Sequence, residues 1–286
     1  MGVPSVVFTK TDFQTGSVPS SVLGILAIIA PAAAGPVNTP AMFQGDALAF
    51  STFGPSPLAE DSSYTLARSN NPIIAVRPTT SVAAAYGPVT KTIAGTAVPV
   101  AGAAVPADSY QVLVSILNGG TIGVAGITYT YSLDGGNTVS AVQALGVGTV
   151  LTIPNFAGGG SPGVSFSIPT GTLIAGDFWT CNTNTAAMSN ADLTTSCNAL
   201  YGSTLPWEGM LVDMGTGMTA STVAQVDSWL QTLEKIGKFR FAILNTRLKN
   251  QFTTPPETEA AYLTAMTTLT STAAPSIRLC VGAAPF

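Results

Sequence analysis

Residues 209–245 read GMLVDMGTGMTASTVAQVDSWLQTLEKIGKFRFAILN and predict a strand, a helix and a second strand in succession. We expect the first strand over Gly209–Val212, the helix over Ala220–Ile236 and the second strand over Phe239–Asn245. Apolar residues recur every three or four positions along the helix, as in a helix that packs one face against a sheet, and Gly237 ends it. These apolar residues are Val223, Val226, Trp229, Leu230, Leu233 and Ile236. Since a helix separates them, the two strands are expected to run parallel, joined by a right-handed crossover.

The same pattern continues on both sides of this stretch. A helix is predicted over Asn190–Tyr201 before it, and a helix over Pro256–Leu269 and a strand over Ile277–Val281 after it. Thr219 or Ser221 can cap the central helix, because either hydroxyl can accept a hydrogen bond from a backbone N–H of the first turn.

An earlier segment, residues 22–79, repeats the α/β pattern. Strands are predicted over Val22–Ile29 and Pro72–Arg77, with helices over Asp46–Phe53 and Pro57–Arg68 between them. We therefore expect this segment to join the same parallel sheet as the second half of the chain.

The helix predicted from Pro57 carries charges that suit its dipole. Proline fits a first turn, Glu60 and Asp61 follow close to the amino end, and Arg68 lies in the last turn. These charges are therefore interpreted as helix-stabilising.

From Ser81 to about Thr185 the composition shifts to Gly, Thr, Val and Ala, with short alternating runs that predict strands. The runs are Tyr110–Leu117, Gly126–Leu133, Thr149–Ile153 and Val164–Ile168. The pair Asp134-Gly135 predicts a tight hairpin turn, because glycine tolerates a positive φ. This region is expected to be an antiparallel β-sandwich or a barrel-like domain.

The expected fold class is α/β plus all-β, in four parts. Residues 1–20 form an N-terminal arm, 21–84 and 187–286 form the α/β domain, and 85–186 form the inserted β domain. The arm holds one short apolar stretch, Val3–Phe8, which cannot bury itself locally and needs a sheet edge on its own domain or on a neighbour.

Composition excludes several functional classes. Only 8% of the 286 residues are charged, with 10 Lys and Arg against 14 Asp and Glu, so the chain has no basic footprint for nucleic acid. It contains no His, which removes the commonest general base and metal ligand. The apolar run Val22–Ala34 is too short to cross a bilayer, and we expect no membrane anchor. A surface this poor in charge is typical of a subunit covered by other chains.

The remaining motifs give no support for a cofactor, a metal or a catalytic centre. Gly158-x-Gly160-x-x-Gly163 matches the dinucleotide pattern by letter, but a strand follows it where a helix is required. Gly215-Thr216-Gly217 lacks a phosphate-binding Lys. Cys181, Cys197 and Cys280 have no metal-ligand spacing, and we interpret them as buried free thiols.

Asp213 ends a predicted strand, and Asp177, Asp192 and Glu208 lie within about forty residues of it. Because their spacing fits no Ca²⁺ loop, we interpret them as scattered surface carboxylates. A hydrolase would need a convergent polar site at the carboxyl ends of the strands, near Asp213, Asn245 and Arg247. There is no G-x-S-x-G motif, and we expect no enzyme activity.

The order of charges points to contacts between copies. Between Thr92 and Glu234 there are eight acidic residues and no basic one, and then five basic residues fall within fifteen positions. Such an uneven distribution favours head-to-tail contacts. The predicted interface residues are Val3, Val6, Val7 and Phe8 of the arm and Lys235, Lys238, Arg240, Arg247 and Lys249.

Several strings together resemble one family. They are SVLGILAI (21–28), GPVNTP (35–40), PIIAVR (72–77), YSLDGGNT (131–138), GDF (176–178) and FAILNTR (241–247). In this order they are similar to the tail sheath proteins of contractile-tailed phages and related contractile injection particles.

The resemblance implies a sheath-type α/β core with an inserted β domain and an extended arm. It implies hexameric rings of copies stacked around a tail tube, linked by exchanged terminal strands, that contract to drive the tube through a cell envelope. The implied partners are other copies, the tube protein, and baseplate and terminator proteins, in a virion tail assembled in the host bacterial cytoplasm. Sheath proteins usually continue with further strands and a C-terminal arm, so we expect a continuation beyond Phe286.

One alternative of another class stays open. An exposed surface rich in Thr, Ser and aromatic residues is also typical of a receptor-binding or adhesin-like β protein of a virion. The α/β halves argue against this alternative.

Overall fold

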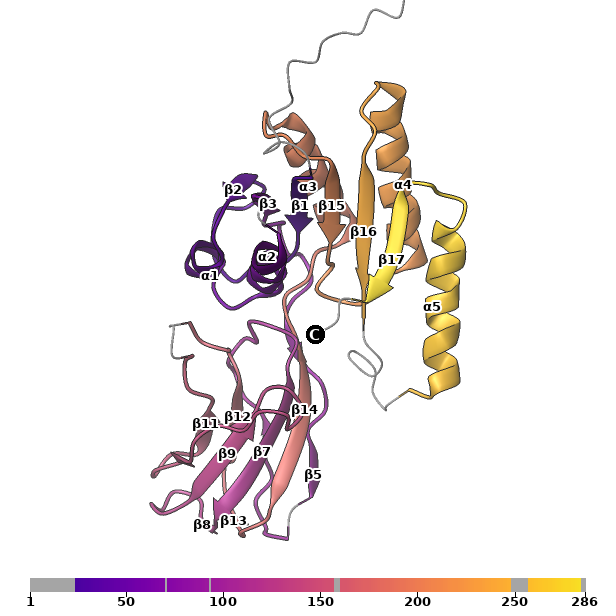
Figure 1. Cartoon of the computed structure of the whole chain (residues 1–286). Helices are drawn as coiled ribbons and strands as arrows, with labels where there is room; N and C mark the ends of the chain where they lie inside the picture. Colours follow the sequence, from indigo (N-terminus) through magenta and orange to yellow (C-terminus); the bar gives the residue numbers. More distant parts are fainter. Residues whose placement is uncertain (1–23, 70, 93, 157–159, 248–256, 284–286) are drawn as a thin grey trace, which may run out of the picture.

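The computed structural model describes residues 24–69, 71–92, 94–156, 160–247 and 257–283. It is a mixed α/β structure with several sheets and, in these residues, five helices. Figure 1 shows an α/β part above a β part, joined where the chain leaves β3 and where it returns from β14. The first 23 residues, including the predicted arm, lie outside the described residues.

The α/β part is built on a six-stranded sheet with the order β17-β16-β15-β1-β3-β2. Neighbouring strands are parallel, except that β2 runs antiparallel to β3. The strands are β1 Leu26–Ile29, β2 Ala41–Phe43, β3 Ile73–Val76, β15 Gly209–Val212, β16 Phe241–Thr246 and β17 Leu279–Ala283. Parallel strands are usually covered by helices on both faces, and the two central strands here follow that rule.

Helices α1 (Asp46–Phe53) and α2 (Pro57–Arg68) cover one face of the sheet beside β1 and β3. The other face carries α3 (Asn190–Gly202), α4 (Ala220–Lys235) and α5 (Glu259–Ala273). Side chains of β1 alternate between the two layers, with Ile28 in the first core and Ala27 and Ile29 in the second. Each layer therefore buries one set of alternating strand residues.

Each long helix begins after a hydroxyl cap, and the starts of α2, α3 and α4 agree with the prediction, whereas α5 begins at Glu259 after Thr258 and not at Pro256. Ser56 Oγ accepts from Ala59 N before Pro57, and Thr219 Oγ1 accepts from Thr222 N before α4. Ser189 and Asp192 form a reciprocal capping box at α3. The cap of α4 is thus Thr219.

In the β part, one sheet has the order β10-β9-β7-β14-β4, with β5 also paired to β14, and two smaller sheets are β11-β12-β6 and β13-β8. Their strands share one core around Phe166 and Trp179, whose rings meet edge to face at 5.8 Å. The strands are β4 Ala85–Tyr86, β5 Thr90–Thr92, β6 Val100–Ala101, β7 Gln111–Asn118, β8 Gly120–Thr121, β9 Thr128–Ser132, β10 Gln143–Ala144, β11 Val150–Thr152, β12 Ser165–Ser167, β13 Thr172–Leu173 and β14 Phe178–Asn184. No sheet in the described residues closes on itself, so the barrel-like alternative is wrong.

Some predictions of detail need correction. Asp134-Gly135 does not form a two-residue hairpin, because β9 pairs with β10, which begins only at Gln143. Asp134 instead accepts hydrogen bonds from Ser132 Oγ, Thr138 N and Thr138 Oγ1 and organises a longer loop. The turn residue was recognised, but the loop length was not.

Two residues that were predicted to be buried are exposed. Ile236 lies beyond the end of α4 and is exposed, although the periodic pattern includes it in the buried face. Cys280 is exposed, whereas Cys181 and Cys197 are buried free thiols as expected. No helix of the described chain is long and apolar enough to cross a membrane.

Candidate functional site

A cavity of about 630 Å³ lies where the α/β and β parts meet. Its lining comes from the first turns of α2, from residues 108–111 and 133–138 of the β part, and from the ends of β15 and β16. The cavity lies at the carboxyl ends of β15 and β16. The connection after β1 leads to one face of the sheet and the connection after β15 to the other, so the strand order changes direction between these two neighbours, which makes a topological switch point. In open α/β sheets this is where ligands bind.

Five carboxylic acids line this cavity. Asp134 belongs to a loop of the β part, and the other four are Glu60, Asp61, Asp108 and Asp213. Asp61 is only 5% exposed and Asp108 only 7%, while Glu60 is exposed and its carboxyl group hydrogen-bonds that of Asp108. We call these four residues the acidic cluster. Interpreting Asp213 as one of several scattered surface carboxylates was therefore wrong.

Burial dominates the ionisation of the acidic cluster. It raises the pKa of Asp61 to about 8, and the negative charges of Asp213 and Glu60 add to the effect. The pKa of Asp108 is raised for the same reason, burial first and the charge of Glu60 second. A raised carboxyl pKa means that the neutral form is favoured in the folded protein.

Asp213 is held in place by two hydrogen bonds. Its Oδ1 accepts from Gly215 N at 2.7 Å, and its Oδ2 accepts from Asn245 Nδ2 at 2.7 Å. The side chain of Asn245 thereby links the end of β16 to the end of β15. Burial still raises the pKa of Asp213.

Arg247 is the single basic residue among the described residues that line the cavity. Its guanidinium group forms a bidentate pair with Glu257, with Nη2 2.7 Å from Oε2, and lies 5.4 Å from the ring of Tyr262. Glu257 therefore balances one charge of Arg247 at the edge of this cavity.

The predicted basic interface residues do not form one surface. Lys235, Lys238 and Arg240 lie before β16, at the amino ends of the strands, whereas Arg247 lies just after β16, at the carboxyl ends. Lys238 Nζ lies 4.4 Å from the ring of Tyr201. Lys249 and the arm residues Val3, Val6, Val7 and Phe8 fall outside the described residues.

Apolar side chains are exposed beside these three basic residues. Phe239 is 71% exposed and Ile277 is 91% exposed, and the two line one hollow of about 160 Å³. Ile236 and Phe241 are also exposed at this end of the sheet. We call Phe239 and Ile277 the apolar patch.

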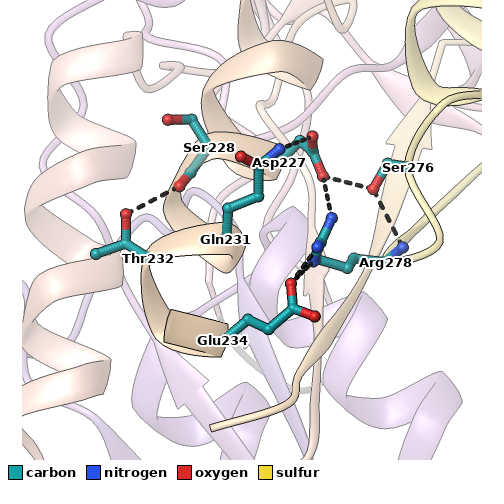
Figure 2. Close-up of polar contacts among 7 residues, drawn as sticks. All are labelled: Asp227, Ser228, Gln231, Thr232, Glu234, Ser276 and Arg278. Carbon is teal, nitrogen blue, oxygen red and sulfur yellow. Dashed lines mark hydrogen bonds and ion pairs between the residues drawn. The ribbon is translucent and has the colours of Figure 1, made fainter. Parts of the chain in front are cut away.

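The loop that presents Ile277 is held by a polar network, drawn in Figure 2. Arg278 bridges two acidic residues of α4, with Nε 2.8 Å from Glu234 Oε2 and Nη1 3.5 Å from Asp227 Oδ1. Ser276 Oγ donates to Asp227 and accepts from Arg278 N. Both neighbours of Ile277 are therefore tied down, while its own side chain points into solvent.

The other acids singled out in the sequence each anchor a local segment. Asp177 is buried and accepts hydrogen bonds from Ala94 N, Gly95 N and Ile174 N. Asp192 belongs to the capping box of α3, and Glu208 accepts from Gly24 N. They do not form a joint site with Asp213.

The dinucleotide-like pattern also has a structural reason. Gly163 has φ +67°, and a Cβ atom there would lie 1.8 Å from the carbonyl oxygen of Val105. Gly160 likewise adopts a positive φ of +83°. Backbone conformation and close approach explain these two glycines without a nucleotide.

Sequence reasoning missed three members of the acidic cluster. Glu60 and Asp61 were interpreted only through the helix dipole, although Asp61 lies three residues after the buried Leu58 and so falls on the inward face of α2. Asp108 follows 47 positions later, in another part of the fold. The spacing to Leu58 was the available signal for Asp61, and nothing in the sequence linked Asp108 to it.

Comparisons with known proteins identify a family. No curated protein matches the sequence. The crystal structure of the sheath tail protein Lin1278 from Listeria innocua aligns with a TM-score of 0.34 and 13% identity, over 77% of this chain and 47% of that chain, a likeness too low to assign a function. A family model described as DUF2586, N-terminal domain, matches residues 3–285. Since the match spans almost the whole sequence, the chain belongs to the DUF2586 family, whose N-terminal domain it represents.

Proposed function

We propose that this chain is a structural subunit of a virion tail, of the contractile sheath kind that its sequence resembles. Copies stack as rings around a tail tube and contract to drive the tube through the host envelope. Their partners are other copies, the tube protein, and the baseplate and terminator proteins. The chain has no catalytic role in this proposal.

The observation that carries the proposal is the apolar patch. A side chain such as Ile277 gains about 1.5–3 kcal/mol when it leaves water for an apolar environment. The residues on either side of it are held by Asp227 and Glu234, and in this arrangement its side chain is 91% exposed. An isoleucine held in this way is suited to bury itself in another molecule.

An open sheet edge supports the same function. β17 is the last strand of its sheet, and no strand pairs with its outer side among the described residues. An edge strand presents unpaired backbone N–H and C=O groups that a segment of another chain can satisfy. We propose that Val3–Phe8 of a neighbouring copy adds to such an edge.

The placement of charge supports head-to-tail contacts between successive copies. Lys235, Lys238 and Arg240 lie at the amino ends of the strands, and the acidic cluster lies at the carboxyl ends. Contacts between two different surfaces are heterologous, and they produce rings or helical stacks instead of closed pairs.

The adhesin-like alternative has one observation in its favour. In the β part, Val139 and Val142 before β10 and Val147 after it are all exposed. An exposed apolar loop is suited to bind a host molecule. This alternative requires that the β part, and not the apolar patch, carry the binding.

The test compares sedimentation velocity of the protein with that of its variants over a range of concentrations. We expect concentration-dependent assembly in the wild type and its loss in Ile277→Asp and Phe239→Asp. Val105→Asp is the matched control, because Val105, at 69% exposed, is close to Phe239 in exposure but belongs to the β part. If the two patch variants assembled as the wild type does, the apolar patch would not be the interface. Assembly lost only in Val105→Asp would place the contact between copies on the β part and contradict the proposed role of the apolar patch.

A further inference from the structure

We propose that the cavity containing the acidic cluster binds an organic cation, an ammonium or guanidinium group that its carboxylates hold. This inference does not depend on the proposed tail function. It names a ligand site where two acids of α2, one that follows β15 and one from the β part line a space large enough for a side chain or a small amine.

The strongest observation is an oxygen without a donor. Asp61 Oδ2 is buried and has no hydrogen-bond partner in the part of the chain that the structure describes. Asp61 lines the cavity and is 95% shielded from solvent, being 5% exposed. When Asp61 is ionised, this unpaired buried oxygen is costly, so the site then lacks a donor that a bound cation would supply.

The balance of charge points the same way. The cavity has four acids of the acidic cluster against one described arginine, and that arginine is engaged by Glu257. Groups of like charge in a partly buried space repel one another strongly. A cation or bound protons must therefore neutralise them.

The lining favours an organic cation over a metal ion. Among the described residues no group of three or more His, Cys, Asp or Glu side chains is placed to hold a metal ion. The cavity is also much larger than one ion, and its walls include Tyr110, Leu133 and Phe156. Aromatic and aliphatic surfaces suit the alkyl stem of an amine or the flat face of a guanidinium group.

Protons are the competitor for the same site. The groups that face Asp61 are Glu60 on its own helix, Asp213 after β15 and Asp108 from the β part, together with Arg247, which is paired. Since burial raises the pKa of Asp61 to about 8, a cation that binds its ionised form must displace a proton. Affinity for the cation should therefore increase as the pH rises from 6 to 9.

Two probes test the site: spermidine for the ammonium group and L-arginine methyl ester for the guanidinium group. Binding is measured at pH 8 by calorimetry and thermal shift, with NaCl and MgCl₂ at matched ionic strength as references. We expect saturable binding of at least one probe, with at least tenfold weaker binding to Asp61→Asn. Glu259→Gln is the matched control, an exposed acid in the first turn of α5, and should bind within twofold of the wild type.

Asp213→Asn provides a second variant in case Asp61→Asn does not fold, which far-UV circular dichroism checks. The proposal is overturned if neither probe binds the wild type, if NaCl or MgCl₂ stabilises it equally, or if both cavity variants bind as the wild type does. Where a probe does bind, its effect on self-assembly distinguishes the two sources of the cation. Dispersal of assemblies by the probe indicates a Lys or Arg of a second copy, and unchanged assemblies indicate a free amine.

Discussion

Asp61 is a buried carboxyl group with a raised pKa, although it was interpreted from the sequence only as a helix-stabilising charge. It follows the first turn of an ordinary capped helix, yet its side chain is buried at a cavity lined by further acids. A carboxyl group whose pKa is raised on folding holds its proton more tightly in the folded state than in the unfolded state. The stability it confers is present below its unfolded pKa, near 4, and is lost as the pH rises to about 8.

Asp61→Asn should therefore raise stability at high pH and leave it unchanged at low pH. Asparagine has the size of the protonated acid but cannot ionise. At pH 8 and without an added cation we expect a gain of at least about 1 kcal/mol, which is about 2–4 °C in Tm for a chain of this size. Thermal unfolding from pH 3 to pH 9 measures the difference, which should vanish below about pH 4, where the carboxyl group is protonated in both states, and grow as the pH rises to about 8. A constant difference across this range would contradict the assigned ionisation.

The two arginine pairs differ in how far they are buried. Arg247 and Glu257 are largely shielded from solvent, whereas Arg278 and Glu234 are more exposed. Removing one partner of a largely shielded pair leaves a poorly solvated charge, whereas solvent screens the charge left behind in a more exposed pair. Arg247→Met should thus destabilise the protein more than Arg278→Met does in urea unfolding. The reverse order would contradict the burial of the Arg247 pair.

Helices whose ends are marked by capping residues and proline could be predicted from the sequence, whereas elements that form only through tertiary pairing could not. The bounds of α1 and α2 were predicted correctly, and at α2 the hydroxyl cap and the first-turn proline mark the start. β2 was not predicted, because Ala41–Phe43 has no pattern of its own and becomes a strand by pairing with β3. The junction cavity could not be predicted for the same reason, since Asp108 reaches it only through the packing of the β part.

The cap of α4 offers a test at this scale. Both Thr219 and Ser221 could serve by sequence, but the structure assigns the cap to Thr219. Thr219→Ala should cost about 1 kcal/mol, within the range of about 0.5–2 kcal/mol for lost caps. Ser221→Ala should cost less, because Ser221 Oγ only accepts a hydrogen bond from Asn190 at an exposed position. Urea unfolding of the two variants compares them, and equal losses would contradict this assignment.

The whole molecule has two unlike ends along its parallel sheet. One end carries the apolar patch and three basic residues, and the other carries the acidic cluster beside the β part. The order of charges predicted separate acidic and basic regions, but Arg247, which was predicted with the basic residues, lies at the same end as the acidic cluster. The tail sheath function, the ring architecture and the role of the arm remain proposals that an assembly experiment must test.

Negative-stain electron microscopy of the purified protein at high concentration, beside the particle from which it comes, tests the central claim most directly. We predict stacked rings or striated tubes for the wild type, and dispersed molecules for Ile277→Asp at the same concentration. Wild-type protein that stayed dispersed at every concentration, or Ile277→Asp forming the same tubes, would contradict assembly through the apolar patch.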